Sequence, residues 1–366
     1  MMRSMARVKK TAARVAAILL LLLTLGMIAW VARPLYLDHI YYRGSVSNHF
    51  DGQRFFNPEG EQGTGGDRNG PGLGRIFALI TGDRGPGWPN SVPVASTIPP
   101  ERIAGSAMRV TWIGHSTVLV QTQGLNILTD PVWVDKVGPL GLVGASRVRP
   151  PGVRLADLPK IDLILISHNH YDHMDVATLR TLWNRDRPLI VTSLGNDAIL
   201  KDHGIAAQAR DWGGRVGVRP GITVIIERAH HWSSRWGEDR NRALWSGFTV
   251  TLPGGNIFYA GDTGQGDGSW IRSAAKDGPF RLALLPIGAF HPRKVFSGNH
   301  IDPQQSVQVF RDIGARHALG VHWGTFKLTE EEMNEPKIEL AGALKAAKIS
   351  AGRFITTEVG QGWMVP

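Results

Sequence analysis

The pattern of apolar and polar positions divides the chain into three parts. An uncharged apolar run of 18 residues extends from Val15 to Ala32. From Met108 onward, short apolar runs of strand length alternate with turns and a few helical stretches. The region from 45 to 107 is rich in Gly and Pro and predicts a linker and wrapping extension. We therefore expect an anchor segment at 1–44 and a folded domain at 108–366.

Within the folded domain, strands come early and late and helices lie between them. This order predicts an α/β fold of two sheets covered by helices on their outer faces. The expected strands are Arg109–Ile113, Thr117–Thr122, Asn126–Thr129, Ile161–Ile166, Leu189–Thr192, Thr223–Glu227, Ser246–Leu252, Asn256–Tyr259, Leu282–Pro286 and His317–Val321. The expected helices are Arg75–Ile80 in the extension and Val176–Asn184, Ala198–Asp202, Trp270–Lys276, Pro303–Ile313 and Ile338–Lys348 in the domain. Pro303 fits a first helical turn with Asp302 as its cap.

The apolar run near the N-terminus favours a single membrane-spanning helix. Its length corresponds to about 27 Å of helix, close to the hydrocarbon thickness of a bilayer. A cleaved signal peptide and a buried core helix are the alternatives, but no Ala-x-Ala cleavage site follows the run. Five positive charges precede it, which predicts a cytoplasmic N-terminus, with the domain on the periplasmic or extracellular side of a bacterial inner membrane.

Composition and charge narrow the function classes. The chain has 366 residues, 42% of them apolar, and no cysteine, which excludes disulfides, thiolate ligands and cysteine nucleophiles. The net charge is +10, but 7 of the 41 basic residues and only one acid lie before residue 45. The chain after residue 44 has a small charge excess and no clustered run of Lys and Arg, so it does not predict a nucleic-acid partner.

A dense group of metal-ligating side chains follows a buried-strand signal. Residues 167 to 175 read Ser-His-Asn-His-Tyr-Asp-His-Met-Asp. An extended turn can aim His168 and His170 at one cation, and Asp172 and His173 then fall to a second cation nearby. Neutral imidazole together with carboxylate oxygen suits Zn2+.

Three later strand ends offer the further ligands that a site with two metals needs. The pair His230-His231 follows one strand, Asp262 lies in a Gly-Asp-Thr-Gly turn, and His322 follows another strand. Strand alternation alone does not choose between His230 and His231. Glycines on both sides of Asp262 allow the backbone to turn sharply.

The sequence resembles the metallo-β-lactamase-fold hydrolases, and within them the branch of N-acylphosphatidylethanolamine-hydrolysing phospholipases D and their bacterial relatives. The resemblance covers residues 108 to about 336 in order. It is carried by Trp112-Ile-Gly-His-Ser-Thr117, Leu128-Thr-Asp-Pro131, Ile166-Ser-His-Asn-His-Tyr-Asp-His173, Gly278-Pro-Phe280, Pro286-Ile-Gly-Ala289, His300-Ile-Asp-Pro303 and His322-Trp-Gly-Thr-Phe326. It implies a four-layer αββα sandwich as the catalytic domain.

The resemblance also implies roles for single residues. Two Zn2+ ions per chain are expected, one held by His168, His170 and His231 and the other by Asp172, His173 and His322, with Asp262 bridging both. His231 is preferred because it precedes a tryptophan, as in the family.

Other side chains are expected around these ligands. Asp172 or Asp262 would orient the attacking water, and His300 would donate a proton or hydrogen bond to an oxygen of the substrate. Tyr171 and His300 match positions that meet the substrate in the family. The alternatives are that Tyr171 packs between the ligands and that His300 is a helix-entry residue beside the Asp302 cap. Asp130 is expected to hydrogen-bond a ligand imidazole, or to end a strand in an Asp-Pro turn. His115 is assigned no metal and only closes a turn.

The expected activity is hydrolysis of N-acylphosphatidylethanolamine or a related phospholipid at the membrane, by a chain that forms a possible homodimer. An apolar segment from Pro131 to Val143, followed by Arg147, Arg149 and Arg154, is either a lip that admits acyl chains or a loop packed over the sheet edge. Two alternatives stay open. One is a lactone, thioester or β-lactam hydrolase on the same site, and the other is a non-catalytic envelope protein.

Overall fold

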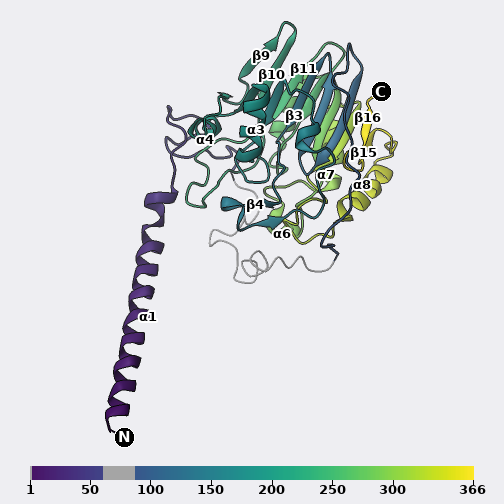
Figure 1. Ribbon diagram of the computed structural model, residues 1–366. Coiled ribbons are helices and arrows are strands. Elements are labelled where there is room, and N and C mark those ends of the chain that lie inside the picture. Colours follow the sequence, from purple (N-terminus) through teal and green to yellow (C-terminus); the bar gives the residue numbers. More distant parts are fainter. Residues whose placement is uncertain (1, 61–86) are drawn as a thin grey trace.

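Two seven-stranded sheets pack face to face and are flanked by helices (Figure 1). The computed structural model describes residues 2–60 and 87–366, so the helix expected at Arg75–Ile80 lies outside the described residues. The first sheet has the order β16 (Gly362–Met364), β1 (Met108–Gly114), β2 (Thr117–Thr122), β3 (Leu125–Thr129), β6 (Leu163–Ile166), β7 (Leu189–Ser193) and β8 (Gln208–Arg210). The second has the order β15 (Phe354–Ile355), β14 (His317–Val321), β13 (Phe280–Pro286), β12 (Asn256–Tyr259), β11 (Gly247–Thr251), β10 (Ile222–Glu227) and β9 (Arg215–Arg219).

Five helices of the domain lie where the pattern of the sequence places them, and one short helix, α6 (Arg293–Phe296), was not predicted. The elements are α3 (Val176–Asp186), α4 (Asn196–Asp202), α5 (Ser269–Ala274), α6 (Arg293–Phe296), α7 (Pro303–Asp312) and α8 (Glu335–Ala346), with short 3-10 turns η1 (Pro139–Gly141), η2 (Leu155–Asp157) and η3 (Ala275–Asp277). All ten expected strands are present, with ends that differ by at most two residues. The two-sheet prediction is confirmed.

The missed strands are short or lie at sheet edges. β8 and β9 end their sheets and contain mostly polar residues and glycine, and β15 and β16 have only two and three residues. A two-stranded hairpin of β4 (Lys136–Val137) and β5 (Ala145–Ser146) was also missed. Such strands bury too few apolar side chains to produce a recognisable alternation.

The central strands are buried on both faces, which explains their continuous apolar runs. In β6, Leu163 and Leu165 join the large core between the sheets, whereas Ile164 and Ile166 join the core under α3 and α4. β2 divides in the same way, with Val118 and Val120 on one face and Leu119 on the other. Helices α5, α7 and α8 cover the second sheet through residues such as Trp270, Phe310 and Leu340, which belong to the large core.

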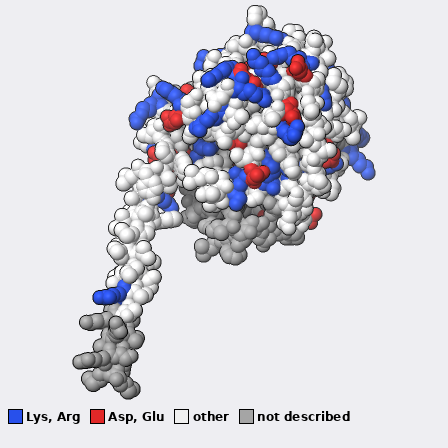
Figure 2. Space-filling model, viewed as in Figure 1, with Lys and Arg blue, Asp and Glu red and all other residues white. Residues whose placement is uncertain are grey.

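The apolar N-terminal run lies in a helix that projects away from the domain. Helix α1 (Met2–Leu37) contains the stretch Arg14–Leu37, which is long and apolar enough to cross a membrane and is not buried against the rest of the chain. Figures 1 and 2 show it as a stem whose described surface is almost free of charged side chains. This arrangement contradicts the buried-core alternative and is compatible with a membrane span or a signal sequence.

Candidate metal centre

The turn from 167 to 175 is held in place by the strand beside it and by the helix after it. It leaves β6, and Asp130 directly follows the neighbouring strand β3. The Asp130 carboxylate accepts hydrogen bonds from Ser167 N at 2.7 Å and from Ser167 Oγ at 2.5 Å. At the other end, Asp175 caps α3 by accepting from Ala177 N and Thr178 N. Both ends of the turn are therefore anchored to regular structure.

Three of the expected ligands form one cluster. Candidate ligand atoms of His168, His170 and His231 lie within 4.8 Å of one another. His168 Nε2 lies 2.8 Å from His170 Nδ1. The His231 ring is oriented by the Asn299 carbonyl, which lies 2.9 Å from Nδ1 and leaves Nε2 directed toward the cluster. His230 is turned away from this cluster toward Glu59, so the geometry favours His231 over His230 as the ligand.

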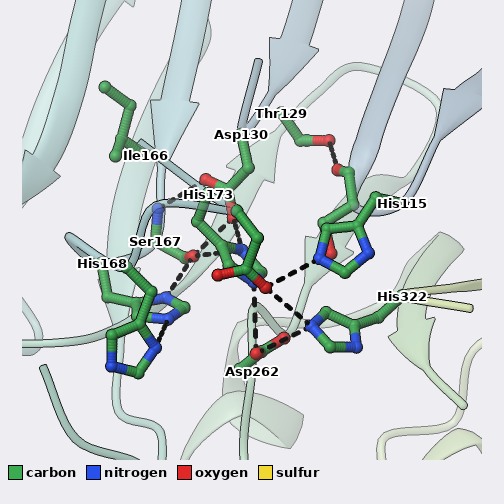
Figure 3. Close-up of polar contacts among 12 residues, drawn as sticks. His115, Thr129, Asp130, Ile166, Ser167, His168, His173, Asp262 and His322 are labelled. Atoms are coloured by element: carbon green, nitrogen blue, oxygen red, sulfur yellow. Dashed lines mark hydrogen bonds and ion pairs between the residues drawn. The ribbon is translucent and has the colours of Figure 1, made fainter. Parts of the chain in front are cut away.

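A second cluster contains Asp172, His173 and His322, with Asp262 between the clusters (Figure 3). Asp262 Oδ2 lies 3.2 Å from His173 Nε2 and 3.0 Å from His322 Nε2. The same oxygen is 3.9 Å from His231 Nε2, in the first cluster. The structure thus brings together all seven residues that the sequence nominated as metal ligands, from four separate segments of the chain.

His115 also belongs to the second cluster, although the sequence prediction gave it only a turn. Its Nε2 lies 2.9 Å from Asp172 Oδ2, and the ring is almost fully buried. It follows the end of β1, a position equivalent to that of the other clustered histidines, so a strand-end histidine was the available signal. That prediction was incomplete because nothing in the local sequence links β1 to the turn after β6.

Asp130 contacts a predicted ligand imidazole, as expected. Its Oδ2 lies 2.6 Å from His173 Nδ1 and also accepts from Tyr259 OH at 2.5 Å (Figure 3). An imidazole whose Nδ1–H is held by a carboxylate presents Nε2 as a free acceptor. Asp130 therefore fixes both the ring orientation and the tautomer of His173.

The backbone around the site adopts conformations that few residues tolerate. His115, Asp130 and His322 all have positive φ, at 53°, 30° and 64°. Positive φ in residues other than glycine costs of order 1–3 kcal/mol each and persists where surrounding contacts impose it. Gly261 also has positive φ, and a Cβ there would lie 2.8 Å from Ser167 Cβ. The glycine before Asp262 therefore allows the two sheets to approach.

Electrostatics divide the ligands into neutral imidazoles and charged carboxylates. Burial lowers the pKa of His168 and His231 well below the ordinary value and that of His170 to about 3. Burial opposes ionisation of Asp172 and Asp262, yet the imidazoles beside them hold both pKa values well below the usual range. Neutral imidazole and ionised carboxylate are the protonation states that bind metals.

The histidines beside the two carboxylates behave differently. Burial lowers the pKa of His322, but Asp262 and Asp172 outweigh it and raise that pKa to about 9. The pKa of His173 is likewise raised well above its ordinary value against the effect of burial. These protons mark a place of strongly negative potential, where a bound cation would compete with them.

Buried polar atoms without partners indicate that the residues fit a metal. Within the described part of the chain, Nε2 of His170, His173, His231 and His322, together with Asp262 Oδ1, are buried and have no hydrogen-bond partner. Leaving so many polar atoms unpaired in one place would cost several kcal/mol. Coordination of divalent cations by these atoms would remove that cost.

The clusters lie at the base of a cavity of about 810 Å³. His170, Asp172 and Asp262 line it from the metal side, together with Tyr171 and His300. The His300 side chain is 13% exposed, its Nδ1 is 3.9 Å from Asp262 Oδ2, and partial burial lowers its pKa to about 4. The rest of the lining is largely apolar and includes Val137, Pro139, Val143, Ala145, Phe296 and Leu328.

Arg235 connects the loop after β10 with the turn after β6, and the sequence analysis did not predict this role. Its guanidinium donates to the carbonyl oxygens of Asn169 at 2.9 Å and Met174 at 3.0 Å, within the turn after β6. It also lies 4.0 Å from the centre of the Tyr171 ring. Tyr171 therefore packs against Arg235 and faces the cavity at the same time.

Comparison with known sequences places the chain in a family. Residues 125–323 match the family described as beta-lactamase superfamily domain. N-acyl-phosphatidylethanolamine-hydrolyzing phospholipase D 1 of Caenorhabditis elegans is 34% identical over 333 residues, which cover 86% of this chain and 93% of that protein. The mitochondrial N-acyl-phosphatidylethanolamine-hydrolyzing phospholipase D of Saccharomyces cerevisiae is 36% identical over 236 residues, 63% of this chain and 50% of its own.

Solved structures share the architecture. Igni18, a metallo hydrolase from Ignicoccus hospitalis KIN4/I, aligns with a TM-score of 0.53 and 22% identity over 71% of this chain and 98% of that one. At that identity the likeness concerns the fold alone. Together with the matched domain and the relative that aligns over most of both chains, it establishes that this chain belongs to the beta-lactamase superfamily, in the branch of metallo-hydrolases that contains the N-acylphosphatidylethanolamine-hydrolysing phospholipases D.

Proposed function

We propose that the chain is a membrane-anchored phosphodiesterase with two Zn2+ ions, which cleaves N-acylphosphatidylethanolamine or a related phospholipid in the manner of a phospholipase D. The observation that carries the proposal is the grouping of seven ligand side chains at the base of a largely apolar cavity. The names of the relatives from Caenorhabditis elegans and Saccharomyces cerevisiae supply the substrate class.

Each ligand has a place in this proposal. His168, His170 and His231 would hold one ion, Asp172, His173 and His322 the other, and Asp262 would contact both. When bound, zinc lowers the pKa of water toward neutrality and takes up charge that develops on phosphoryl oxygen. No side-chain nucleophile is then needed, in agreement with the absence of cysteine from the sequence.

The chain's own residues would orient the reactants. Asp172 and Asp262, both ionised, are the acceptors that can align an attacking water. His300 faces the cavity as a neutral imidazole, because its pKa is about 4, and can donate one N–H to a phosphate or leaving oxygen. Tyr171, whose buried hydroxyl has no hydrogen-bond partner among the described residues, offers a further hydrogen bond to the substrate.

The position of the cavity supports a lipid substrate. The hairpin of β4 and β5 lines it, and at its tip Leu140 and Leu142 are 81% and 71% exposed. In Figure 1, β4 and α6 lie toward the end of the domain from which α1 projects. If α1 spans the inner membrane with a cytoplasmic N-terminus, the domain stands on the periplasmic or extracellular side, and the apolar hairpin can meet the bilayer surface.

The test is a panel of phosphodiester lipids, lactones, thioesters and a β-lactam, assayed with the full chain in detergent and read by product mass. We expect an N-acylethanolamine and a phosphatidic acid from N-acylphosphatidylethanolamine. Asp262→Asn should lower the rate by more than about 100-fold, because it removes a ligand rather than a supporting contact.

The matched control is Asp267→Asn, which makes the same change at an exposed acid five residues further along. It should retain the rate of the natural chain. Turnover of lactones or thioesters without any phosphodiester would replace the proposed substrate class. Full activity in Asp262→Asn would overturn the proposed site, and no turnover of any kind would favour a non-catalytic envelope protein.

A further inference from the structure

Two side chains of the segment 38–60 reach the metal centre from the N-terminal side. Asn57 Nδ2 donates a hydrogen bond to the His231 carbonyl at 3.0 Å, and Glu59 Oε1 lies 2.5 Å from His230 Nδ1. Asn57 is 7% exposed, and the Glu59 side chain is equally buried. These contacts join residues separated by 174 and 171 positions in the sequence.

Hydrogen bonds from two parts of the chain hold the pair His230-His231, and the segment 38–60 is one of these parts. His230 N donates to Thr263 Oγ1 at 3.0 Å, and the His230 carbonyl accepts from Gly264 N at 2.7 Å. Those contacts connect the pair to the turn that carries Asp262. Asn57 and Glu59 fix the opposite side, so the backbone that carries the His231 ring cannot shift without breaking a buried hydrogen bond.

The second oxygen of Glu59 pairs with Arg228, at the start of the same loop. The Glu59 carboxylate therefore joins the first residue after β10 to the residue beside the ligand. A carboxylate that accepts from both side chains restricts the loop more than either contact alone.

The segment is packed firmly enough to act as a support. Phe50 and Phe55 are buried in one cluster with Leu244 and Trp245 of the loop, and Phe55 N donates to Asn241 O at 2.8 Å. Nearer to α1, Asp38 accepts from Arg242 Nε at 2.7 Å and also pairs with Arg54. The segment thus contacts the loop after β10 at several points between Asp38 and Glu59 rather than only at its end.

We propose that residues 38–60 are part of the metal centre and that Asn57 and Glu59 are positioning residues for His231. The inference rests on the proposed role of His231 as a ligand, and it places the start of the catalytic unit before residue 108. Helix α1 leads directly into this segment.

The test measures zinc retention by the full chain carrying Asn57→Asp or Glu59→Gln. Both variants keep the volume of the side chain. The control is Asp51→Asn, which makes an acid-to-amide change in the same segment at an exposed residue, whose carboxylate accepts hydrogen bonds from the backbone N–H groups of Gln53 and Arg54. Each protein is loaded with zinc, dialysed against graded chelator, and its zinc per chain is measured. Thermal unfolding of the metal-free proteins is recorded in parallel.

We expect one of the two zinc ions to be released at about 10- to 100-fold lower chelator strength in both variants, as when outer hydrogen bonds to a ligand are lost. The second ion should be retained as in the natural chain, and metal-free unfolding should match that of Asp51→Asn. If both ions are released as in the natural chain, the inference is overturned. It is also overturned if both ions are released more easily and the metal-free variant unfolds at a correspondingly lower temperature. If either variant fails to fold, the other decides.

The outcome is separable from that of the proposed function. A natural chain that holds two zinc ions but cleaves no phospholipid would refute the substrate and leave this inference to the zinc measurement. A natural chain that holds fewer than two ions would overturn both.

Discussion

The two loops that supply the first metal cluster are supported in different ways. The turn after β6 is supported by its own sheet, through Asp130, which directly follows the neighbouring strand β3 and lies 43 positions from His173, and by the cap on α3. The loop after β10, which carries His231, is braced by the N-terminal segment, 171 positions away. The first support lies within the folded domain predicted from the sequence, and the second lies outside it. A metal centre can therefore extend beyond the region that carries its motifs.

The largest effect is expected when the turn after β6 loses its support from Asp130. Asp130→Asn replaces an acceptor that serves His173, Ser167 and Tyr259 at once. Removing the charged partner from a buried pair costs about 3–5 kcal/mol, so we expect a loss of that order in the free energy of unfolding of the metal-free protein. Urea denaturation measures it. The exposed Asp135→Asn should change it by less than about 0.5 kcal/mol, and an equal effect of both variants would contradict the assigned role of Asp130.

A second prediction concerns Glu227, the last residue of β10, from which the loop carrying His231 leaves. Glu227 is buried there and accepts from Thr249 Oγ1 at 2.5 Å. Burial raises its pKa from the ordinary 4.5 to about 7. Between pH 4.5 and pH 7 the native state therefore holds a proton that the unfolded chain has released. The free energy of unfolding falls as the pH rises through this range, and the full loss, about 3 kcal/mol, is present above pH 7.

Glu227→Gln removes the titration while keeping an acceptor for Thr249. Compared with the natural chain, the variant should gain about 3 kcal/mol in relative stability between pH 4.5 and pH 8. Urea denaturation at both pH values gives the difference. A parallel pH dependence in the two proteins would show that Glu227 does not titrate in this range.

The smallest expected effect concerns the far end of the turn after β6. Asp175→Ala removes the side chain that caps α3 and accepts from Ala177 N and Thr178 N. Loss of such a cap costs about 1–2 kcal/mol. Urea denaturation should register this decrease, and zinc retention should change less than in Asp130→Asn, since Asp175 touches no candidate ligand. Zinc loss equal to that of Asp130→Asn would show that the helix cap, rather than Asp130, orients the turn.

Much of the fold and of the ligand set could be predicted because their signals are local. The uninterrupted apolar residues of β6 indicate directly that this strand is buried. The residues His168, His170, Asp172 and His173 lie within one turn. Asp262 and His322 were recognisable because each follows a strand and has glycine nearby. The capping of α7 by Asp302 was correct for the same reason, since Pro303 and Gln305 complete it within three residues.

The remainder depends on contacts between distant segments. Strand alternation near His230 and His231 does not decide which ring faces the clustered side chains, because that choice follows from Glu59 and Asn299. His115 escaped assignment since its partner Asp172 lies 57 positions away. Arg235 was missed because only tertiary packing places it against the turn after β6.

The central claim is that the seven clustered ligands hold two zinc ions, and the metal content of the purified full chain tests it most directly. Inductively coupled plasma mass spectrometry of the protein, after dialysis without chelator, should return close to two zinc ions per chain. Asp262→Asn should return fewer, because that residue lies between the clusters. One ion or none in the natural chain, or an unchanged content in Asp262→Asn, would contradict the account.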